Sequence, residues 1–307
     1  MGKVIVFGSL NMDLTIECDA MPQAGQTLQG RNFLTNPGGK GGNQAVAAAK
    51  LGAPTWMIAR VGQDLFGEQV RLALEESGVD CTYVDRSDCN NTGVAVITRC
   101  GGDNRIILNA GANHEMCGKD VVAILDKLAE PKDIFVTQYE CEQQAVIDAL
   151  SAAKSHRLFT LFNPAPAKPI PADAYANIDL IVVNQTECEF LTGLYPRDKA
   201  SCQNALSRFK AMGVGDAIIT LGEKGSVCRM GDDVILVDSY PVPNVDTTAA
   251  GDSYIGALAC ALVRGNNVEQ CMRFATKVAS LTITRQGAQQ SIPYLNEVEA
   301  YFKEELK

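Results

Sequence analysis

The sequence predicts an α/β protein, in which helices cover both faces of a mainly parallel central sheet and a second, smaller sheet is attached. After His114, apolar runs of strand length alternate with amphipathic stretches of helical length. Such alternation is typical of a parallel sheet between two helical layers. Before His114, short pieces of alternating polarity at residues 14–16 and 27–33 are separated by Pro22 and Gly25. This second pattern is typical of strands in a small sheet outside the main core.

The first part of the chain mixes the two kinds of element. Residues 4–7 form a short apolar run that ends at Gly8 and predict a buried parallel strand. An alanine-rich helix is expected up to Leu51, followed by a strand at 56–61 and a helix at 66–77. Residues 93–98 and 105–108 predict a hairpin across the turn at 100–104.

The second part of the chain carries the regular alternation. The predicted strands are residues 134–138, 158–162, 180–183 and 217–221, and the predicted helices are residues 142–154, 199–212, 251–264 and 268–282. In open sheets of this kind, ligands bind at the carboxyl ends of the strands.

Composition narrows the function classes. The chain has 307 residues, of which 46% are hydrophobic, so it can bury a large core in one domain or two. A formal net charge of −9 argues against nucleic acid as a partner, because phosphate backbones are bound by clusters of Lys and Arg. Neither a signal peptide nor a membrane-spanning run is recognisable, so we expect a cytoplasmic protein without a membrane partner.

The cysteines and histidines exclude several kinds of site. The 11 cysteines include no C-x-x-C pair, so we expect free thiols in a reducing compartment. The two histidines, His114 and His156, are too few for a multi-histidine metal site, and neither lies in a recognisable triad motif.

One stretch dominates the functional interpretation: residues 244–256, N-V-D-T-T-A-A-G-D-S-Y-I-G. It changes from polar turn residues to small apolar ones and is expected to open a helix, whose first amides suit a phosphate. Gly251 would let an oxygen approach the backbone. Asp252 would then stand beside this anion hole, where a carboxylate can accept a proton from an attacking hydroxyl. The alternative is that Asp252 is an ordinary acid in the first turn of a helix.

A second stretch, residues 36–52, contains four glycines among residues 38–42, followed by the alanine-rich helix. The glycines allow a ligand to approach the backbone closely. The spacing matches neither a Walker phosphate loop nor a dinucleotide fingerprint. Asn11 and Asp13 precede this stretch and would share one face of a strand, where they could bind sugar hydroxyls; they could equally be turn formers.

Polar residues also follow the predicted strands of the second half. Glu140, Asn163, the pair Asn184 and Glu187, and the segment 220–225 each come at a strand's carboxyl end. Any one of them could be an ordinary loop residue, but together they predict a ligand in one crevice.

The segment D-T-T-A-A-G-D closely resembles a signature of the ribokinase-like (PfkB) carbohydrate kinases, and G-G-K-G-G-N-Q-A resembles a second one. The resemblance covers about residues 4–293. It implies a ribokinase-like three-layer α/β/α fold, a single kinase domain over 1–307. It also implies a discontinuous β lid, at about 14–36 and 93–109, that closes over the sugar. Lid closure would exclude water from the transferable phosphate.

The resemblance also implies roles for particular residues. Asp252 would be the general base, and the amides of Ala249, Ala250, Gly251 and Asp252 the anion hole. The sugar would be held by Asn11, Asp13, Gly39, Lys40, Gly41, Gly42, Asn43, Glu140 and Asp252. The nucleotide would be bound by Asn184, Thr220, Leu221, Gly222, Glu223, Lys224, Gly225, Gly251 and Thr276. Two positions depart from the family pattern: Thr276 replaces a common His or Asn, and Gly42 replaces a common Ala.

Two cations are implied as well. Asn184 and Glu187 would organise Mg²⁺ through its waters. A monovalent cation, K⁺, would be bound largely by backbone carbonyls of Asp246, Thr248, Thr282, Arg285, Gly287 and Ser291; the alternative is a plain loop.

Taken together, the resemblance implies ATP-dependent phosphorylation of D-ribose at its 5-hydroxyl, by a homodimer that pairs through its lid. Within the family, another sugar or nucleoside kinase, such as a deoxyribokinase-like enzyme, is the nearest alternative. Outside this activity, a catalytically silent sugar-binding regulator is a second alternative. A nucleotide-dependent oxidoreductase is a third, but the sequence lacks its fingerprint.

Overall fold

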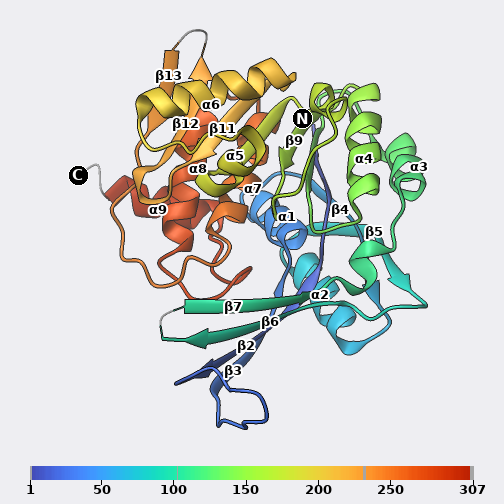
Figure 1. Cartoon of the computed structure of the whole chain (residues 1–307). Coiled ribbons are helices and arrows are strands. Elements are labelled where there is room, and N and C mark those ends of the chain that lie inside the picture. Colours follow the sequence, from blue (N-terminus) through green and yellow to red (C-terminus); the bar gives the residue numbers. More distant parts are fainter. Residues whose placement is uncertain (1, 102, 231–232, 305–307) are drawn as a thin grey trace.

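Two separate sheets organise the chain in the computed structural model, which describes residues 2–101, 103–230 and 233–304. Residues 1, 102, 231–232 and 305–307, which fall within the expected domain or lid, lie outside the described residues. The larger sheet forms the centre of the molecule, and the smaller one projects below it in the view of Figure 1. Among the described residues, none of the helices combines the length and hydropathy that a membrane span requires.

The larger sheet has the strand order β13-β12-β11-β10-β9-β8-β1-β4-β5 over the described residues. Its strands are β1 (Val4–Phe7), β4 (Thr55–Gly62), β5 (Val79–Ser87), β8 (Ile134–Gln138), β9 (Phe159–Asn163), β10 (Leu180–Asn184), β11 (Asp216–Thr220), β12 (Ser226–Met230) and β13 (Asp233–Val237). From β11 to β5 all neighbours are parallel, and β12 and β13 add an antiparallel edge. The predicted parallel sheet is therefore confirmed.

Helices cover both faces of this sheet, and alternate side chains of each strand face opposite cores. Val4 and Val6 face one core, while Ile5 and Phe7 face the other. The first core includes side chains from α1 (Lys40–Lys50), α2 (Leu65–Glu76), α7 (Ala250–Val263), α8 (Val268–Thr282) and α9 (Leu295–Glu304). The second includes side chains from α3 (Gly118–Leu128), α4 (Gln143–Ser155), α5 (Gln185–Thr192) and α6 (Lys199–Met212).

The smaller sheet has the order β3-β2-β6-β7. Its strands are β2 (Asn11–Cys18), β3 (Arg31–Gly38), β6 (Gly93–Cys100) and β7 (Asp103–Asn109). The predicted strand at 27–33 is wrong in its first half. Residues 27–30 pair with no strand among the described residues, because the last pair of the β2–β3 ladder is Glu17 with Arg31 and β2 ends at Cys18. The strand runs on through Pro37 instead, which an edge strand tolerates.

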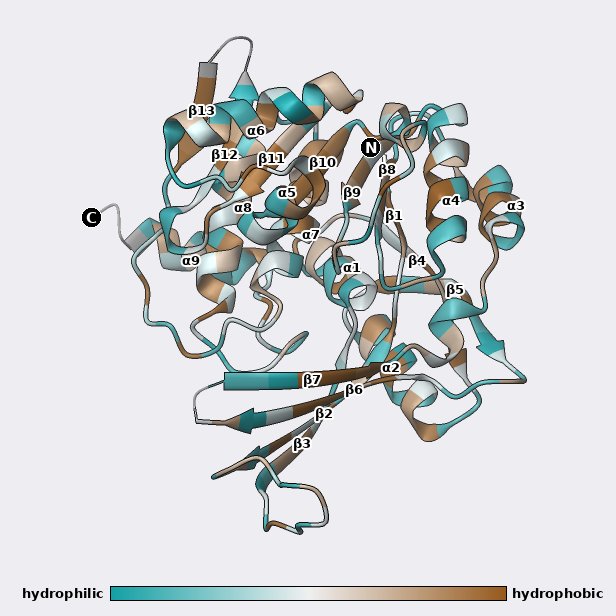
Figure 2. Cartoon of the chain, in the orientation of Figure 1, coloured by the Kyte–Doolittle hydropathy of each residue, from teal (hydrophilic) through white to brown (hydrophobic). Residues whose placement is uncertain are grey.

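Apolar side chains are exposed on the smaller sheet. Every residue of β7 is exposed, and brown apolar segments lie along β6 and β7 in Figure 2. The exposed set is Phe33, Leu34, Val96, Ile106, Ile107 and Leu108.

Candidate active site

Asp252 lies in the first turn of α7, which begins at Ala250. Ala249 precedes the helix in the left-handed conformation, with φ of 60°, which costs energy for a residue with a Cβ and so marks a tightly determined turn. A Cβ added to Gly251 would meet no atom within 4 Å, so this glycine faces open space. Of the four expected anion-hole amides, that of Ala250 already donates to Thr247 O over 3.2 Å, so among the described residues those of Ala249, Gly251 and Asp252 are left for a ligand.

Two amide side chains of α1 hold the Asp252 carboxylate. Asn43 Nδ2 donates to Oδ2 over 2.9 Å and Gln44 Nε2 donates to Oδ1 over 3.0 Å. Only 8% of Asp252 is exposed. The two helices approach closely at Gly256, where a Cβ would lie 2.5 Å from the Cβ of Ala47. The two sequence motifs, more than two hundred residues apart, thus meet at one carboxylate.

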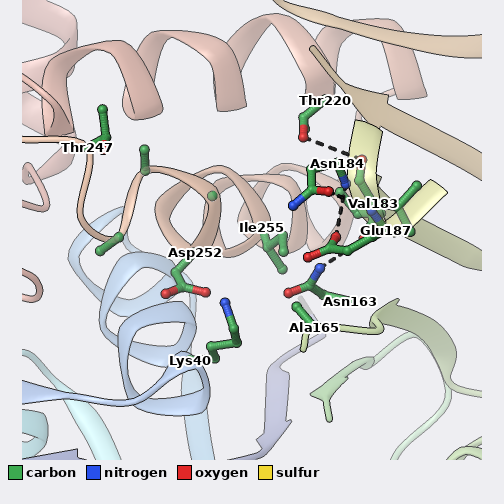
Figure 3. A pocket seen from close by; sticks show the side chains of 14 residues that line it. Lys40, Asn163, Ala165, Val183, Asn184, Glu187, Thr220, Thr247, Asp252 and Ile255 are labelled. Carbon is green, nitrogen blue, oxygen red and sulfur yellow. Dashed lines mark hydrogen bonds between the residues drawn. The ribbon is translucent and has the colours of Figure 1, made fainter. Parts of the chain in front are cut away.

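A cavity of about 230 Å³ opens in front of Asp252 (Figure 3). It is lined by residues from five parts of the chain, among them Lys40, Asn163, Asn184, Glu187 and Thr220. In Figure 3 the ammonium of Lys40 points toward the Asp252 carboxylate. The Asp252 charge raises the pKa of Lys40, and the charges of Glu140 and Glu187 add to this against the opposing effect of burial. Lys40 is therefore a fixed positive charge on this side of Asp252.

A second cavity, of about 240 Å³, lies between the smaller sheet and the loops around Thr247 and Gly287. Asp13 lines it from β2, and Arg99 lines it from β6. Burial, with the charges of Glu140 and Asp252, raises the pKa of Asp13 to about 7. A ligand that donates hydrogen bonds to Asp13 would therefore stabilise the charged form of this carboxyl group.

Backbone and side chains around this second cavity are fixed by residues that the sequence analysis did not single out. Asn113 Nδ2 donates to Asn11 Oδ1 over 2.8 Å, which leaves the Asn11 amide N–H groups to other partners. Glu140 Oε2 accepts from Ser9 Oγ over 2.5 Å and from the Lys40 amide over 3.1 Å.

The glycine-rich segment before α1 is closely packed. Gly39 has φ of 86°, and a Cβ on Gly41 would lie 2.6 Å from the Gly8 backbone. Gly42 packs against Leu10 and Gln289, where an added Cβ would lie 2.9 Å from each side chain. The buried Asn43 Oδ1 has no partner among the described residues, so it can accept a hydrogen bond from a ligand.

A third and larger cavity, of about 590 Å³, extends from the start of α7 toward α8. The expected nucleotide residues that line it are Thr220, Gly222, Glu223, Gly225, Gly251 and Thr276. Leu221 and Lys224 belong to the same turn but are not among the lining residues. Thr247 lines all three cavities, so the three spaces adjoin beside the start of α7.

Comparison with known proteins identifies the family. The family model described as pfkB family carbohydrate kinase matches residues 1–295. The chain belongs to the pfkB family of carbohydrate kinases. It is therefore a carbohydrate kinase, and the expected ribokinase-like fold is confirmed.

Individual relatives of this pfkB kinase are similar over nearly their whole length. The ribokinase of Bacillus subtilis (strain 168) is 36% identical over 299 residues, which cover 97% of this chain and 99% of the relative. The deoxyribokinase of Salmonella typhi is 34% identical over 304 residues, covering 97% and 98%. The structure of Arabidopsis thaliana ribokinase complexed with ribose and ATP matches with a TM-score of 0.90 at 32% identity, over 98% of each chain.

Asn184 and Glu187, the residues expected to organise Mg²⁺, lie at the start of α5 in the pfkB kinase. Asn184 and Glu187 form a reciprocal cap, in which Asn184 N donates to Glu187 Oε2 and Glu187 N donates to Asn184 Oδ1. Burial raises the pKa of Glu187 despite this bond, so a nearby cation would favour its charged form. Within the described ranges no three acidic, His or Cys side chains are grouped as metal ligands. A bound Mg²⁺ would hence take most of its ligands from water and phosphate.

The expected monovalent-cation residues are only partly brought together. Asp246 Oδ1 accepts from the amide and hydroxyl of Thr248, and Oδ2 accepts from Arg99 Nη2 at 2.9 Å and from Gly287 N at 3.2 Å. Although burial opposes it, these bonds lower the pKa of Asp246. The carboxylate thus already has four donors, and Arg99 already supplies a positive charge.

The remaining side chains of the expected cation set are engaged elsewhere. Thr282 Oγ1 donates to Val278 O, Ser291 Oγ donates to Ala288 O, and Arg285 forms an ion pair with Glu297. These side chains do not fit a cation as ligands, so any cation bound at this loop would depend on backbone carbonyl oxygens.

Proposed function

We propose that this kinase transfers the terminal phosphoryl group of ATP to the 5-hydroxyl of D-ribose. One observation carries the proposal: a carboxylate held by two amides stands at the amide end of α7, where a cavity lined by Asp13 adjoins two cavities suited to a nucleotide. The relatives named ribokinase, and the Arabidopsis structure with ribose and ATP, support the choice of substrates.

The position of each residue in the site indicates its role in the reaction. Asp252 accepts the proton of the 5-hydroxyl as its oxygen forms the bond to the γ-phosphorus, and the bond to the bridging oxygen of ADP breaks. The amides of Ala249, Gly251 and Asp252 and the ammonium of Lys40 stabilise the charge that develops on the transferring group. Asn11, Asp13, Asn43 and Glu140 hold the sugar, and the cavity beside Thr276 receives the nucleoside.

The proposal includes binding sites for Mg²⁺ and for K⁺. Asn184 and Glu187 hold Mg²⁺ through its waters, and the cation neutralises phosphate charge. The crystal structure of a putative ribokinase II from E. coli is a complex with ATP and Mg²⁺, but at 23% identity it supports only the fold of this chain. Backbone carbonyls of the loops at 246–248 and 282–291 bind K⁺.

We also propose that the smaller sheet acts as a lid over the sugar, that two copies pair through it, and that the enzyme is cytoplasmic. The exposed apolar side chains of β6 and β7 support the pairing. The cysteines support a reducing compartment, since all eleven are free thiols.

The nearest rival is 2-deoxyribose as the acceptor, because the deoxyribokinase relative is almost as similar as the ribokinase one. Comparing kcat/KM for ribose, 2-deoxyribose, fructose and nucleosides, with ATP and Mg²⁺ and with or without K⁺, decides between them. We expect ribose to be preferred; indifference to ribose overturns the assignment.

Asp252→Asn tests the base. The variant should lose about 10²- to 10⁴-fold in kcat, since a positioned base contributes about that much, while calorimetry should still detect ribose binding. Turnover close to that of the wild type would show that another group takes the proton.

A further inference from the structure

The carboxylate of Asp252 is the end of a chain of buried amides that reaches the middle of the central sheet. Gln44 Nε2 donates to Asp252 Oδ1 over 3.0 Å, and Gln138 Nε2 donates to Gln44 Oε1 over 2.7 Å. Gln44 is 1% exposed and Gln138 is fully buried. Gln138 is the last residue of β8, and Gln44 lies in the first turns of α1.

The direction of this chain is set at its carboxylate end. A carboxylate only accepts hydrogen bonds, so Gln44 must turn its NH₂ group toward Asp252 and its carbonyl oxygen toward Gln138. Gln138 must then present its own NH₂ group to that oxygen. Conversely, Gln138 fixes the orientation of the Gln44 amide, because a flipped Gln44 would place two NH₂ groups against each other and a carbonyl oxygen against the carboxylate.

The bond to Gln44 is the side-chain hydrogen bond that Gln138 makes among the described residues. Its Oε1 has no hydrogen-bond partner among the described residues, and it lies where a Cβ of Gly8 would be only 2.2 Å away. A buried amide oxygen without a partner costs free energy. This unpaired oxygen lies close to the glycine-rich segment. Gly8 separates the two, since a Cβ on Gly8 would also lie 2.7 Å from the Gly41 Cα.

We propose that Gln138 and Gln44 are positioning residues that act as an amide relay, which aims the Asp252 carboxylate at the acceptor hydroxyl. Neither side chain lines the three cavities around the site, so they act through Asp252 and not on the substrate. The inference rests on the proposed function of Asp252 as the base, and it holds for whichever sugar proves to be the acceptor.

A double-mutant cycle tests the relay. Gln44→Leu removes a direct donor to the carboxylate and should lower kcat by about 10- to 100-fold, as expected for a lost hydrogen bond to a charged group. Gln138→Leu should lower kcat less, by about threefold to tenfold, because Gln44 can still donate in part of its orientations. Their KM values for sugar and ATP should stay within about threefold of the wild type if both residues act on the chemical step.

The relay makes the two losses non-additive. In the Gln44→Leu background, Gln138→Leu should have almost no further effect on kcat, because the link between Gln138 and Asp252 is already cut. Multiplying losses would overturn the proposal, as would a Gln138→Leu variant with the kcat of the wild type. Thermal unfolding of each variant separates this result from a loss of folded protein.

Gln138→Glu provides a readout that a purely structural role would not move. When the introduced carboxyl group is ionised it can only accept, so Gln44 must flip and turn its oxygen toward Asp252; when protonated, the acid can donate to Gln44 Oε1 as Gln138 does. The kcat of the variant relative to the wild type should therefore fall as pH rises. Gln143→Glu is the control, since Gln143 Nε2 on α4 also donates to a carbonyl oxygen, that of Pro169 over 2.7 Å, but is hydrogen-bonded to neither Gln44 nor Asp252.

The result with the two Gln→Glu variants is decisive in both directions. A ratio that falls with pH in Gln138→Glu and stays level in Gln143→Glu supports the relay. Profiles of the same shape in the two variants, combined with multiplying losses in the cycle, refute it. Failure of the function itself looks different, because the wild-type chain would then phosphorylate no sugar and Asp252→Asn would change nothing.

Discussion

Asp13 is the residue whose titration should be visible in the free protein. Burial and the charges of Glu140 and Asp252 raise its pKa to about 7. A carboxyl group with a raised pKa contributes most to stability while it is protonated, and this contribution is lost as pH rises through the folded-state pKa. The free enzyme should therefore lose stability between about pH 4 and pH 7 through this group.

Asp13→Asn tests whether stability falls with rising pH because of this group. The variant should be more stable than the wild type by on the order of 1–2 kcal/mol at neutral pH, allowing for partial screening, and equal to it in acid. Melting temperatures of both proteins across this pH range give the measurement. Ribose should bind the variant more weakly, because the amide replaces an acceptor with a donor. A stability difference that is independent of pH would contradict the assignment.

At the scale of one helix, two glycines of α7 have opposite roles. Gly251 faces open space at the amide end, whereas Gly256 is pressed against α1. Gly251→Ala should keep the free energy of unfolding within about 1 kcal/mol of the wild type. It should also lower kcat by about 10²-fold, because its methyl group lies where the phosphate approaches.

Gly256→Ala should behave in the reverse way. Its methyl group would meet Ala47 at 2.5 Å, so overpacking should cost about 1–3 kcal/mol of stability, and the folded fraction should retain kcat within about tenfold. Denaturant unfolding together with kcat separates the two effects. If both variants lost only stability, the anion hole would lie elsewhere.

The contact between strand β6 and the loop before α7 is electrostatic. Arg99 donates to Asp246 at 2.9 Å and so supplies a positive charge close to the expected K⁺ loop. Arg99→Gln should cost about 1 kcal/mol of stability and should make kcat/KM more strongly dependent on added K⁺ than in the wild type. Arg105→Gln on the adjacent β7 is the control, because that strand is exposed. If kcat/KM of Arg99→Gln depended on K⁺ as in the wild type, the Arg99 charge would not substitute for that of K⁺.

The elements that were predicted correctly have a regular pattern of buried residues, whereas the elements that were missed lie at the edges of the sheet. Strands β1 and β8 and helices α6 and α8 were predicted with the bounds that the structure gives them, because their apolar residues recur with one clear period. Strand β5 was missed: V-D-C-T-Y-V-D-R-S mixes buried and exposed residues, since it lies at the sheet edge. The antiparallel β12 and β13 were missed at the opposite edge.

The site could be predicted only as far as its motifs. Residues 38–45 and 246–252 carry recognisable signatures, and the structure brings them together. Gln44, Gln138, Asn113 and Arg99 act through contacts across 94 or more sequence positions. No local pattern marks a buried amide as the partner of a distant side chain, so these partnerships emerge only from the folded geometry, even for Gln44, which lies inside a signature.

The molecule as a whole exposes an apolar sheet face that should bury itself against a second copy. Ile107 is 74% exposed on β7. Light scattering should give the mass of a dimer for the wild type and of a monomer for Ile107→Lys, because a charge would be buried in the pair. Leu65→Lys is the matched control, since Leu65 on α2 is also 74% exposed. A wild-type monomer at micromolar concentration would refute pairing through this face.

The cavity in front of Asp252 carries two carboxylates, Asp252 and Glu187, against the single ammonium of Lys40. A bare polyanion entering it would meet like charge before it met the amides of α7. The nucleotide must therefore arrive already neutralised in part by its own counter-ion. Uncomplexed ATP in excess should neither serve as a phosphate donor nor compete well with the complexed form, so the enzyme would respond to the supply of divalent cation as much as to the supply of nucleotide.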